Sequence, residues 1–371
     1  MKEPSILITG GNGYVGVNLA EALLQEGQCA VQLYLHAVDQ AEFESKAEPL
    51  RERFAPYVNA GQLLLIGGEL SDDLPLSSVS AAGIKQIVHS AAVTRFNVDA
   101  ELANKVNVLG SKHVLEFARR CENLESIQFL STIYAAGLRT GPVAEERLET
   151  STFSNHYERS KWESEELLFT KFADLPFNLI RIATLISDNA VGTVSQQNAF
   201  HNTLKLFYYG LLSIFPGEKT CPVYFVTGDF VISSLRSIMH STAIAKVFHI
   251  CHRDFETARL EQLVDTVFDT FEKYPDFKTR RVLRPLWSDV ESFELLQEGI
   301  GELSNGVMSQ AISSVAPFAR QLFAPKQFCN DNLRSLLPSY EAEDPLLLIS
   351  NAAKYLADTK WGRSLKYAQC G

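Results

Sequence analysis

Ile6-Leu-Ile-Thr-Gly-Gly-Asn-Gly-Tyr-Val-Gly16 is a short apolar run that breaks into glycines at positions 10, 13 and 16. The pattern predicts a buried strand, a tight turn and the start of a helix. Bare backbone and a helix N-terminus can approach a pyrophosphate closely, so the turn predicts a dinucleotide site. The residues expected to contact the dinucleotide here are Thr9, Gly10, Asn12, Gly13, Tyr14, Val15 and Gly16.

Strand-like and helix-like segments alternate after this turn. Apolar runs predict strands at 6–9, 31–35, 62–66, 84–89, 126–130, 177–182 and 247–251. Helical patterns lie at 15–25, 41–54, 100–120, 157–172 and 198–210. Continuous apolar strands that alternate with helices indicate a parallel sheet covered on both faces. The expected fold class is therefore α/β, a Rossmann-type doubly wound parallel sheet with a smaller, mainly helical C-terminal substrate lobe.

The regular alternation loosens after residue 187. We expect 1–187 to form the NAD(P)-binding Rossmann domain, with a returning strand near 223–251, and 188–222 with 252–371 to form the substrate-binding lobe. One helical face in this lobe consists of Val307, Ala311, Val315, Phe318 and Leu322 around Pro317. This face fits a helix packed on the core, or a lid or hydrophobic substrate channel.

Composition narrows the class of protein. The 371 residues carry a net charge of −10, which disfavours a main role in binding nucleic acid or an anionic membrane. No apolar run is long enough to span a bilayer and no basic-apolar leader is visible, so we expect a cytoplasmic protein. The six cysteines form no CxxC pair and are expected to be free thiols. His249, Cys251 and His252 lack a second ligand cluster, so no metal site is expected.

Tyr157 and Lys161 are the candidate catalytic pair. The two side chains fall one turn apart on a predicted helix that follows the strand at 126–130. A nearby ammonium and an oxidised nicotinamide are expected to lower the pKa of the phenol, which otherwise lies near 10. Tyr274 and Lys278 repeat the spacing, but Pro275 and charged neighbours interrupt that segment. Context therefore favours the first pair.

Two hydroxyl residues end the strand at 126–130. Ser131 and Thr132 fall at the carboxyl edge of the expected sheet, where open α/β sheets bind ligands. One hydroxyl is expected to donate a hydrogen bond to a substrate carbonyl oxygen. We prefer Thr132, with Ser131 as the alternative.

The end of the second strand bears on the choice of cofactor. A carboxylate there would bind the adenosine ribose diol of NAD, but the sequence has His36, and the nearest acid is Asp39. The missing carboxylate favours NADPH over NADH, although no arginine is present to bind a 2′-phosphate.

The motifs together resemble the extended short-chain dehydrogenase/reductase superfamily. The nearest branch holds fatty acyl-CoA reductases and the terminal thioester reductase domains of peptide and polyketide synthases. The motifs that carry the resemblance, within about 4–250, are His89-Ser-Ala-Ala-Val-Thr-Arg-Phe96, Asn107-Val-Leu-Gly110, Leu130-Ser-Thr132 and Tyr157-Glu-Arg-Ser-Lys-Trp162.

The resemblance implies further site residues. Ser90, Ala91 and Ala92 would lie along the central riboses, Glu69 and Leu70 near the adenine, Ala183 at the nicotinamide pocket, and Asn107 would support the active site. The chain departs from the branch in three places. His36 replaces a basic residue, Ile182-Ala183 replaces a Pro-Gly-like pair, and Tyr224 replaces an aspartate.

The resemblance implies an NAD(P)H-dependent reductase of a hydrophobic substrate. The expected substrate is an acyl thioester on CoA or an acyl carrier protein, reduced to aldehyde or alcohol, with Tyr157 as proton donor and Lys161 binding the nicotinamide ribose. One alternative is a ketone or quinone reductase acting on a hydrophobic secondary metabolite or steroid-like molecule. Two others are a sugar-nucleotide epimerase or dehydratase, and a non-catalytic NAD(P)-binding regulator.

Overall fold

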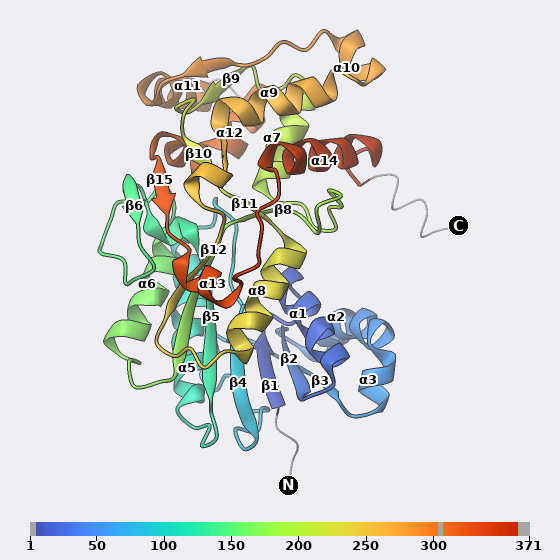
Figure 1. The fold of residues 1–371 in the computed structure, drawn as a ribbon, viewed down its shortest axis with the longest axis vertical. Helices are drawn as coiled ribbons and strands as arrows, with labels where there is room; N and C mark the ends of the chain where they lie inside the picture. Colours follow the sequence, from blue (N-terminus) through green and yellow to red (C-terminus); the bar gives the residue numbers. More distant parts are fainter. Residues whose placement is uncertain (1–4, 303–306, 363–371) are drawn as a thin grey trace.

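The computed structural model describes residues 5–302 and 307–362. A sheet flanked by helices forms one part of the molecule, and a helical lobe lies beyond the carboxyl ends of the strands (Figure 1). The sheet has seven parallel strands in the order β12-β7-β5-β4-β1-β2-β3. These strands are β1 (Ser5–Thr9), β2 (Ala30–His36), β3 (Leu63–Gly68), β4 (Ile84–His89), β5 (Ser126–Thr132), β7 (Phe177–Ile182) and β12 (Val247–Ile250). The predicted doubly wound fold is confirmed.

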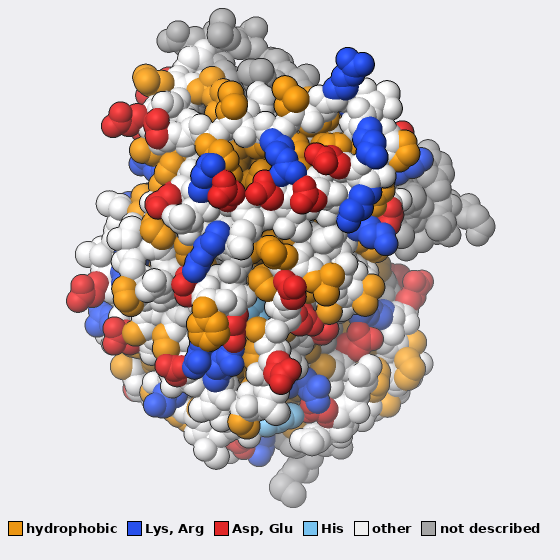
Figure 2. All heavy atoms as spheres, turned by 45° about the horizontal axis from the view of Figure 1, so that its top comes forward, with side chains coloured by type: hydrophobic (Ala, Val, Ile, Leu, Met, Phe, Trp, Pro, Cys, Tyr) orange, Lys and Arg blue, Asp and Glu red, His pale blue; other side chains and the backbone are white. Residues whose placement is uncertain are grey.

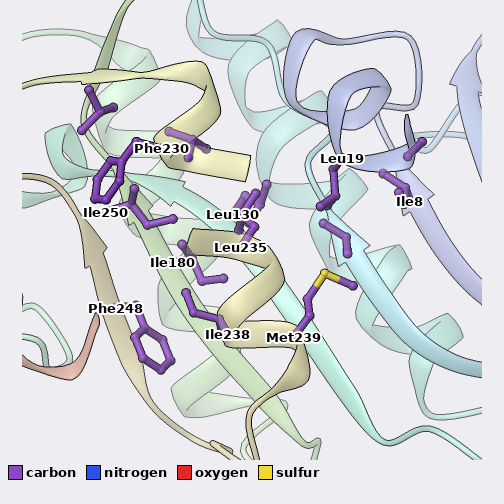
Figure 3. Packing of buried hydrophobic residues seen from close by; sticks show 14 of the residues in the cluster. Ile8, Leu19, Leu130, Ile180, Phe230, Leu235, Ile238, Met239, Phe248 and Ile250 are labelled. Atoms are coloured by element: carbon purple, nitrogen blue, oxygen red, sulfur yellow. The ribbon is translucent and has the colours of Figure 1, made fainter. Parts of the chain in front are cut away.

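Helices cover both faces of the sheet. On one face lie α1 (Tyr14–Glu26), α2 (Gln40–Arg53), α3 (Ala55–Asn59) and α8 (Gly228–His240). Figure 3 shows Phe230, Leu235, Ile238 and Met239 of α8 packed on Leu130, Ile180, Phe248 and Ile250 of the strands. On the other face lie α4 (Ala100–Ala103), the π-helix η1 (Asn104–Leu109), α5 (Gly110–Ala118) and α6 (His156–Thr170). Burial on both faces explains why the strands read as continuous apolar runs.

The expected helix at 100–120 contains an irregularity. Its middle turn is the π-helix η1, and Asn107 lies within it. The backbone oxygen of Asn107 accepts hydrogen bonds from the hydroxyls of Ser111 and Ser164. Side chains therefore satisfy a backbone acceptor that the widened turn frees. Such turns often mark functional positions in helices.

The lobe has a hydrophobic core of its own, centred on Leu204, Phe207, Phe268, Phe271 and Ile349. Its helices are α7 (Ala199–Tyr208), α9 (Leu260–Phe271), α10 (Pro275–Arg280), α11 (Val290–Glu302), α12 (Val307–Ala319) and α14 (Pro345–Asp358). Its short strands are β9 (Ile214–Pro216), β10 (Pro222–Val223), β13 (Ala258–Arg259) and β14 (Leu286–Ser288). On the face drawn in Figure 2, acidic and basic side chains are interspersed.

Several short elements connect the lobe to the sheet. Strand β8 (Thr184–Ser187) pairs with β11 (Phe225–Thr227), and β6 (Gly141–Val143) pairs with β15 (Lys326–Phe328). The remaining elements are η2 (Ile133–Ala136), η3 (Asp254–Glu256), η4 (Arg320–Phe323) and α13 (Asp331–Leu336). Phe328 and Leu333 are buried in the core of the sheet rather than in that of the lobe. The chain therefore returns to the sheet after η4, and the domain boundaries stay a prediction.

The predicted face around Pro317 has two environments. Ala311 and Val315 are buried, while Phe318 and Leu322 line the cavity described below. The side chain of Val307 lies outside the described residues. Within the described ranges, no helix combines the length and apolar character needed to cross a bilayer. The five cysteines in these ranges are free, and Cys370 lies outside them.

Candidate active site

A cavity of about 850 Å³ lies where the carboxyl ends of the strands meet the lobe. The ends of β5 and β7 contribute Leu130, Ser131, Thr132 and Ile182 to its wall, and Tyr157 and Lys161 enter it from α6. Ligands of open α/β sheets bind at this edge, where the strand order reverses between β1 and β4. The structure therefore brings the predicted catalytic side chains into one cavity.

The glycine turn supplies one end of the cavity. Gly10 has a positive φ of 69°, and a Cβ atom at Gly10 would lie 2.8 Å from the backbone nitrogen of Ala91. A Cβ at Gly16 would lie 2.4 Å from the carbonyl oxygen of Gly10. At Gly13 the nearest neighbour is the Gly10 oxygen at 3.2 Å, and Gly13 lines the cavity. Gly10 and Gly16 thus serve internal packing, whereas Gly13 leaves room for a ligand.

The helix that follows the turn fits an anion. Gly13 is the N-cap of α1, and no side chain caps the amides there. No acidic residue lies in the first turn. Free amides and the positive end of the helix dipole can therefore bind a pyrophosphate. Tyr14 and Val15 also line the cavity, Asn12 is exposed, and buried Thr9 bonds His89 Nδ1 through its hydroxyl (2.8 Å).

The residues expected beside the riboses and the nicotinamide lie along the same path. Ser90, Ala92 and Ala183 line the cavity. Ala91 does not line it, because its backbone packs against Gly10. These residues extend the cavity from the glycine turn towards Tyr157.

The residues expected near the adenosine lie outside this cavity, at the ends of β2 and β3. His36 Nε2 is 2.8 Å from a Glu69 carboxylate oxygen, and His36 Nδ1 is 3.2 Å from Lys46 Nζ. Lys46 also donates to the His36 carbonyl oxygen (2.8 Å) and to Glu42 (2.6 Å). Leu70 is buried beside them. Sequence reading missed Lys46, which brings a cation ten residues after His36 back to this strand end.

Tyr157 lies in the first turn of α6 and is 8% exposed. Burial raises its pKa above the usual value of a phenol, and the neighbouring Thr132 side chain acts in the opposite direction. The expectation that Lys161 lowers this pKa is not met in the protein alone. The Lys161 ammonium donates to the Leu130 carbonyl oxygen (2.9 Å), and burial dominates at the phenol. Thr132 and Tyr157 nevertheless lie beside each other at the cavity wall.

Lys161 is itself deeply buried. Burial lowers its pKa to about 8, and the Glu165 carboxylate one turn further along α6 acts to raise it. The carboxylate therefore favours the charged form of an ammonium that the interior disfavours.

Ser131 and Thr132 differ in their partners. Ser131 Oγ donates to Glu165 Oε1 (2.5 Å), so this hydroxyl is committed to a buried carboxylate. Thr132 lies against Tyr157 and accepts a hydrogen bond from the backbone of Tyr134 (3.3 Å). The geometry therefore favours Thr132 over Ser131 as the donor to a substrate oxygen.

A cluster of buried charged residues around Arg181 was not predicted from the sequence. Arg181 on β7 is fully buried and pairs with Glu165 (2.8 Å). Its guanidinium also contacts His249 Nε2 (3.0 Å), and His249 Nδ1 contacts the Cys329 carbonyl oxygen (2.7 Å). The available signal was an arginine within an apolar strand, because a central strand can bury an arginine only beside an anion.

Asn107 connects the site from the opposite side. Its Oδ1 accepts from the backbone of Val93 (2.8 Å), and its Nδ2 donates to Ser160 Oγ on α6 (2.8 Å). Asn107 is fully buried. It joins the loop after β4 to the helix that carries Tyr157, which is a supporting position.

Aromatic side chains close the cavity around Tyr157. The Phe96 ring lies 5.6 Å from that of Tyr157, 5.3 Å from Tyr134 and 5.8 Å from Phe318. Tyr134 is bonded through its hydroxyl to Thr184 (3.0 Å). Edge contacts between rings restrict their positions and exclude water. The sequence did not assign Phe96 and Tyr134 to the site, and it gave Phe318 only as part of a face that fits core packing, a lid or a substrate channel.

Beyond the aromatic wall, the cavity extends into the lobe. Its lining there is mainly apolar and includes Leu204, Phe215, Phe225, Leu260, Leu263 and Leu322. Exposed amides and hydroxyls line it as well, at Gln196, Gln197, Asn202 and Ser313. Tyr224, where the branch has an aspartate, lies in the wall and donates to the Lys326 carbonyl oxygen (2.8 Å). The cavity thus offers an apolar chain a path away from Tyr157.

Solved structures share this architecture. The terminal R domain from the myxalamid PKS-NRPS biosynthetic pathway superposes with a TM-score of 0.75 at 18% identity, covering 97% of this chain and 92% of that one. UDP-glucuronic acid 4-epimerase from Bacillus cereus in complex with NAD gives a TM-score of 0.65 at 17% identity, covering 95% of this chain and 99% of that one. At such identities the likeness shows the fold alone.

Proteins with similar sequences provide a second comparison. Fatty acyl-CoA reductase wat of Drosophila melanogaster is 22% identical over 302 residues, which are 69% of this chain and 56% of that protein. This chain therefore spans little more than half the length of that relative. The model of the NAD-binding family described as Male sterility protein matches residues 8–235, more than half of the chain. The chain belongs to this family.

Proposed function

We propose that the protein is an NAD(P)H-dependent reductase that converts an acyl thioester with a hydrophobic chain into an aldehyde or alcohol. The observation that carries the proposal is that the hydroxyl residues Thr132 and Tyr157 lie beside each other at the wall of a cavity with an apolar extension. Lys161 lies one turn from Tyr157 on α6, and both residues line the same cavity as Gly13 of the glycine turn.

The cofactor fits the residues present. The open face of Gly13 and the uncapped amides of α1 suit a pyrophosphate, and Ser90, Ala92 and Ala183 line the path to Tyr157. When bound, a reduced nicotinamide supplies the hydride for carbonyl reduction. Lys161 would hold the nicotinamide ribose with its ammonium, close to the Leu130 carbonyl oxygen that orients it.

Thr132 and Tyr157 would act on the substrate oxygen. The Thr132 hydroxyl donates a hydrogen bond to the carbonyl oxygen and stabilises the negative charge that develops there. Tyr157 transfers its phenolic proton to that oxygen as the carbonyl carbon accepts the hydride. Burial keeps the phenol protonated beforehand, which suits a proton donor. The product of this step is a hemithioacetal.

The hemithioacetal then divides into two products. Its C–S bond breaks, the hydroxyl proton passes to the sulfur, and an aldehyde and a thiol leave. Reduction of the aldehyde would give the alcohol, once a second NADPH has replaced the oxidised cofactor to supply the hydride and Tyr157 has regained a proton from solvent. Only a thioester substrate releases a thiol, and this separates the proposal from reduction of a ketone or quinone.

The apolar lining from Leu204 to Leu322 supports a hydrophobic acyl chain. The name of the Drosophila relative includes acyl-CoA, and the myxalamid domain belongs to a PKS-NRPS pathway. We therefore propose CoA or an acyl carrier protein as the thiol component.

We further propose NADPH as the preferred cofactor. Lys46, held at the His36 carbonyl oxygen, provides a cation for a 2′-phosphate at the end of β2, although Glu42 shares that cation. Replacing Lys46 with alanine should weaken NADPH binding roughly tenfold and change NADH binding little, as measured by nicotinamide fluorescence. Equal losses for both cofactors would contradict this assignment.

The function itself is tested by product analysis. We expect the purified protein, given NADPH and a long-chain acyl-CoA, to release one thiol for each aldehyde equivalent formed and to oxidise NADPH in proportion. Hydrophobic ketones and quinones serve as comparison substrates. Oxidation of NADPH with those substrates but not with acyl thioesters would refute the thioester proposal and favour the ketone alternative.

A further inference from the structure

Residues 317–326 of the lobe lie against the start of α6, the helix that carries Tyr157. Asn155, the N-cap of α6, accepts from the Glu158 backbone through Oδ1 (2.9 Å) and donates through Nδ2 to the Pro317 carbonyl oxygen (2.9 Å). Phe318, the next residue, contacts the Phe96 ring that lies on Tyr157. The lobe thus contacts both the cap and the aromatic surroundings of the first turn.

Glu158, the residue after Tyr157, is fully buried. Its carboxylate accepts hydrogen bonds from the Ser154 backbone (2.9 Å), the Asn155 side chain (3.0 Å) and Gln321 Nε2 (2.8 Å). Two of these donors precede α6, and the third comes from η4, far away in the sequence. The carboxylate therefore fixes the first turn of α6 to the lobe.

Gln321 relays this contact to a second buried charge. Its Nε2 also donates to the Gly137 carbonyl oxygen (3.2 Å), and its Oε1 accepts from Lys326 Nζ (2.7 Å). Lys326 donates further to the Ala324 carbonyl oxygen (3.1 Å). The amide has a carboxylate on its donor side and an ammonium on its acceptor side, so its orientation is determined.

Stability does not account well for this arrangement. Burial raises the pKa of Glu158 to about 7 and lowers that of Lys326 to about 8, so the interior disfavours both charges. Apolar side chains of similar volume often stabilise a core as well as buried ions do. Hydrogen bonds between charged groups and an amide instead require one geometry. The network is therefore suited to holding the adjacent residue, Tyr157, in one position.

We propose that Gln321 and Lys326 are positioning residues for Tyr157, and that residues 317–326 of the lobe complete an active site otherwise built on the sheet. The proposal rests on the proposed function of Tyr157 as proton donor. Gln321 holds Glu158, and Glu158 holds the first turn of α6 so that the phenol faces Thr132. A misplacement of about 1 Å in a reacting group can cost about 100-fold in rate.

The test replaces Gln321 with methionine, which keeps the length of the side chain and removes both hydrogen-bonding functions. We expect kcat with an acyl-CoA to fall by about 10- to 100-fold, while KM for the thioester and the Kd of NADPH change by less than about threefold. Lys326→Met, which leaves the bond between Gln321 and Glu158 in place, should lower kcat less, with the same split between kcat and KM.

A matched control alters another contact of the C-terminal segment. Glu256 accepts hydrogen bonds from Arg334 of α13 and does not line the cavity. Glu256→Gln should lower Tm and leave kcat unchanged. If Gln321→Met behaves like this control, the network serves stability alone and the proposal is wrong. If KM for the thioester rises with kcat unchanged, Gln321 binds substrate, which also overturns it.

Hydrogen exchange gives a readout independent of turnover. In Gln321→Met, the backbone amides at 156–160 should exchange several times faster than in the parent chain, relative to those at 165–170 farther along α6. A parent chain without turnover would refute the proposed function, and the exchange comparison would then decide the positioning proposal. Unchanged exchange in the first turn would overturn it. If Gln321→Met does not fold, Lys326→Met undergoes the same comparison.

Discussion

Tyr157 and Lys161 lie on α6 at the edge of the parallel sheet, whereas Tyr274 and Lys278 lie at α10 in the lobe with the same spacing. The Tyr157 side chain lies beside that of Thr132, and Lys161 donates to the carbonyl oxygen of Leu130. The Tyr274 hydroxyl instead donates to the Asp358 carboxylate (2.7 Å), and Lys278 is exposed. Only the first pair lines the cavity.

The difference shows that the same spacing of a tyrosine and a lysine can support catalysis only where the neighbouring residues provide a suitable environment. At Tyr274, burial and then the Asp358 carboxylate raise the pKa of the phenol, and the hydroxyl is already engaged in joining α10 to α14. At Tyr157, the partner is a neutral hydroxyl that also faces the cavity. A proton donor needs a path to substrate as well as a proton.

Replacing each tyrosine with phenylalanine tests the comparison most strongly. Tyr157→Phe should lower kcat by about 100- to 10,000-fold, because general acid catalysis contributes on that scale, and should leave NADPH binding nearly unchanged. Tyr274→Phe should leave kcat unchanged and cost about 1 kcal/mol of unfolding free energy through the lost bond to Asp358. Turnover assays and denaturant unfolding measure the two effects. Near-normal turnover of Tyr157→Phe would exclude its role as proton donor.

Replacing each lysine with methionine tests whether contact with the cofactor depends on the position of Lys161 or only on the spacing of a tyrosine and a lysine. Lys161→Met should weaken NADPH binding by about 10- to 100-fold, as expected for a hydrogen bond from a charged group, and Lys278→Met should not weaken it. The Lys161 pKa, lowered by burial to about 8, adds a pH dependence. The ammonium predominates below that pH, so NADPH affinity should fall as the pH rises above about 8. Equal affinities for both variants at pH 7 would contradict this role for Lys161.

The sheet could be predicted from the sequence because strands buried on both faces leave few alternatives. The strands at 84–89 and 177–182 have the predicted bounds. β5 continues two residues beyond the prediction, through Ser131 and Thr132, where the apolar pattern ends. The Glu165 carboxylate bonds Ser131 there, and a local pattern does not show such a distant partner.

The site could be predicted only in part. The sequence indicated the positions that line the cavity, because Thr132, Tyr157 and Lys161 lie near predicted element ends. It did not indicate Gln321 and Lys326, because Gln321 and Glu158 are 163 residues apart in the chain. It also predicted a phenol made more acidic by Lys161 together with an oxidised nicotinamide, whereas burial in the protein alone raises the pKa of that phenol. Burial and distant partners depend on tertiary packing, which periodicity does not encode.

The carboxyl residue that follows each tyrosine extends the comparison to the stability of the folded chain and its dependence on pH. Glu158, after Tyr157, is buried with a pKa raised to about 7 by burial, whereas Asp276, shortly after Tyr274, is exposed. The folded chain binds the Glu158 proton more tightly than the unfolded chain does, where its pKa is near the ordinary 4.5. This contribution to stability is fully present below pH 4.5 and is lost as the pH rises through about 7.

Glu158→Gln removes this titration. The unfolding free energy of the parent chain minus that of Glu158→Gln should therefore fall as the pH rises from about 4.5 to above 7, by up to about 3 kcal/mol. Urea unfolding of the two chains at several pH values measures this difference. A flat difference for Glu158→Gln would mean that the carboxyl is ionised in the folded chain throughout, and that Gln321 and Lys326 hold it as a full charge beside Tyr157.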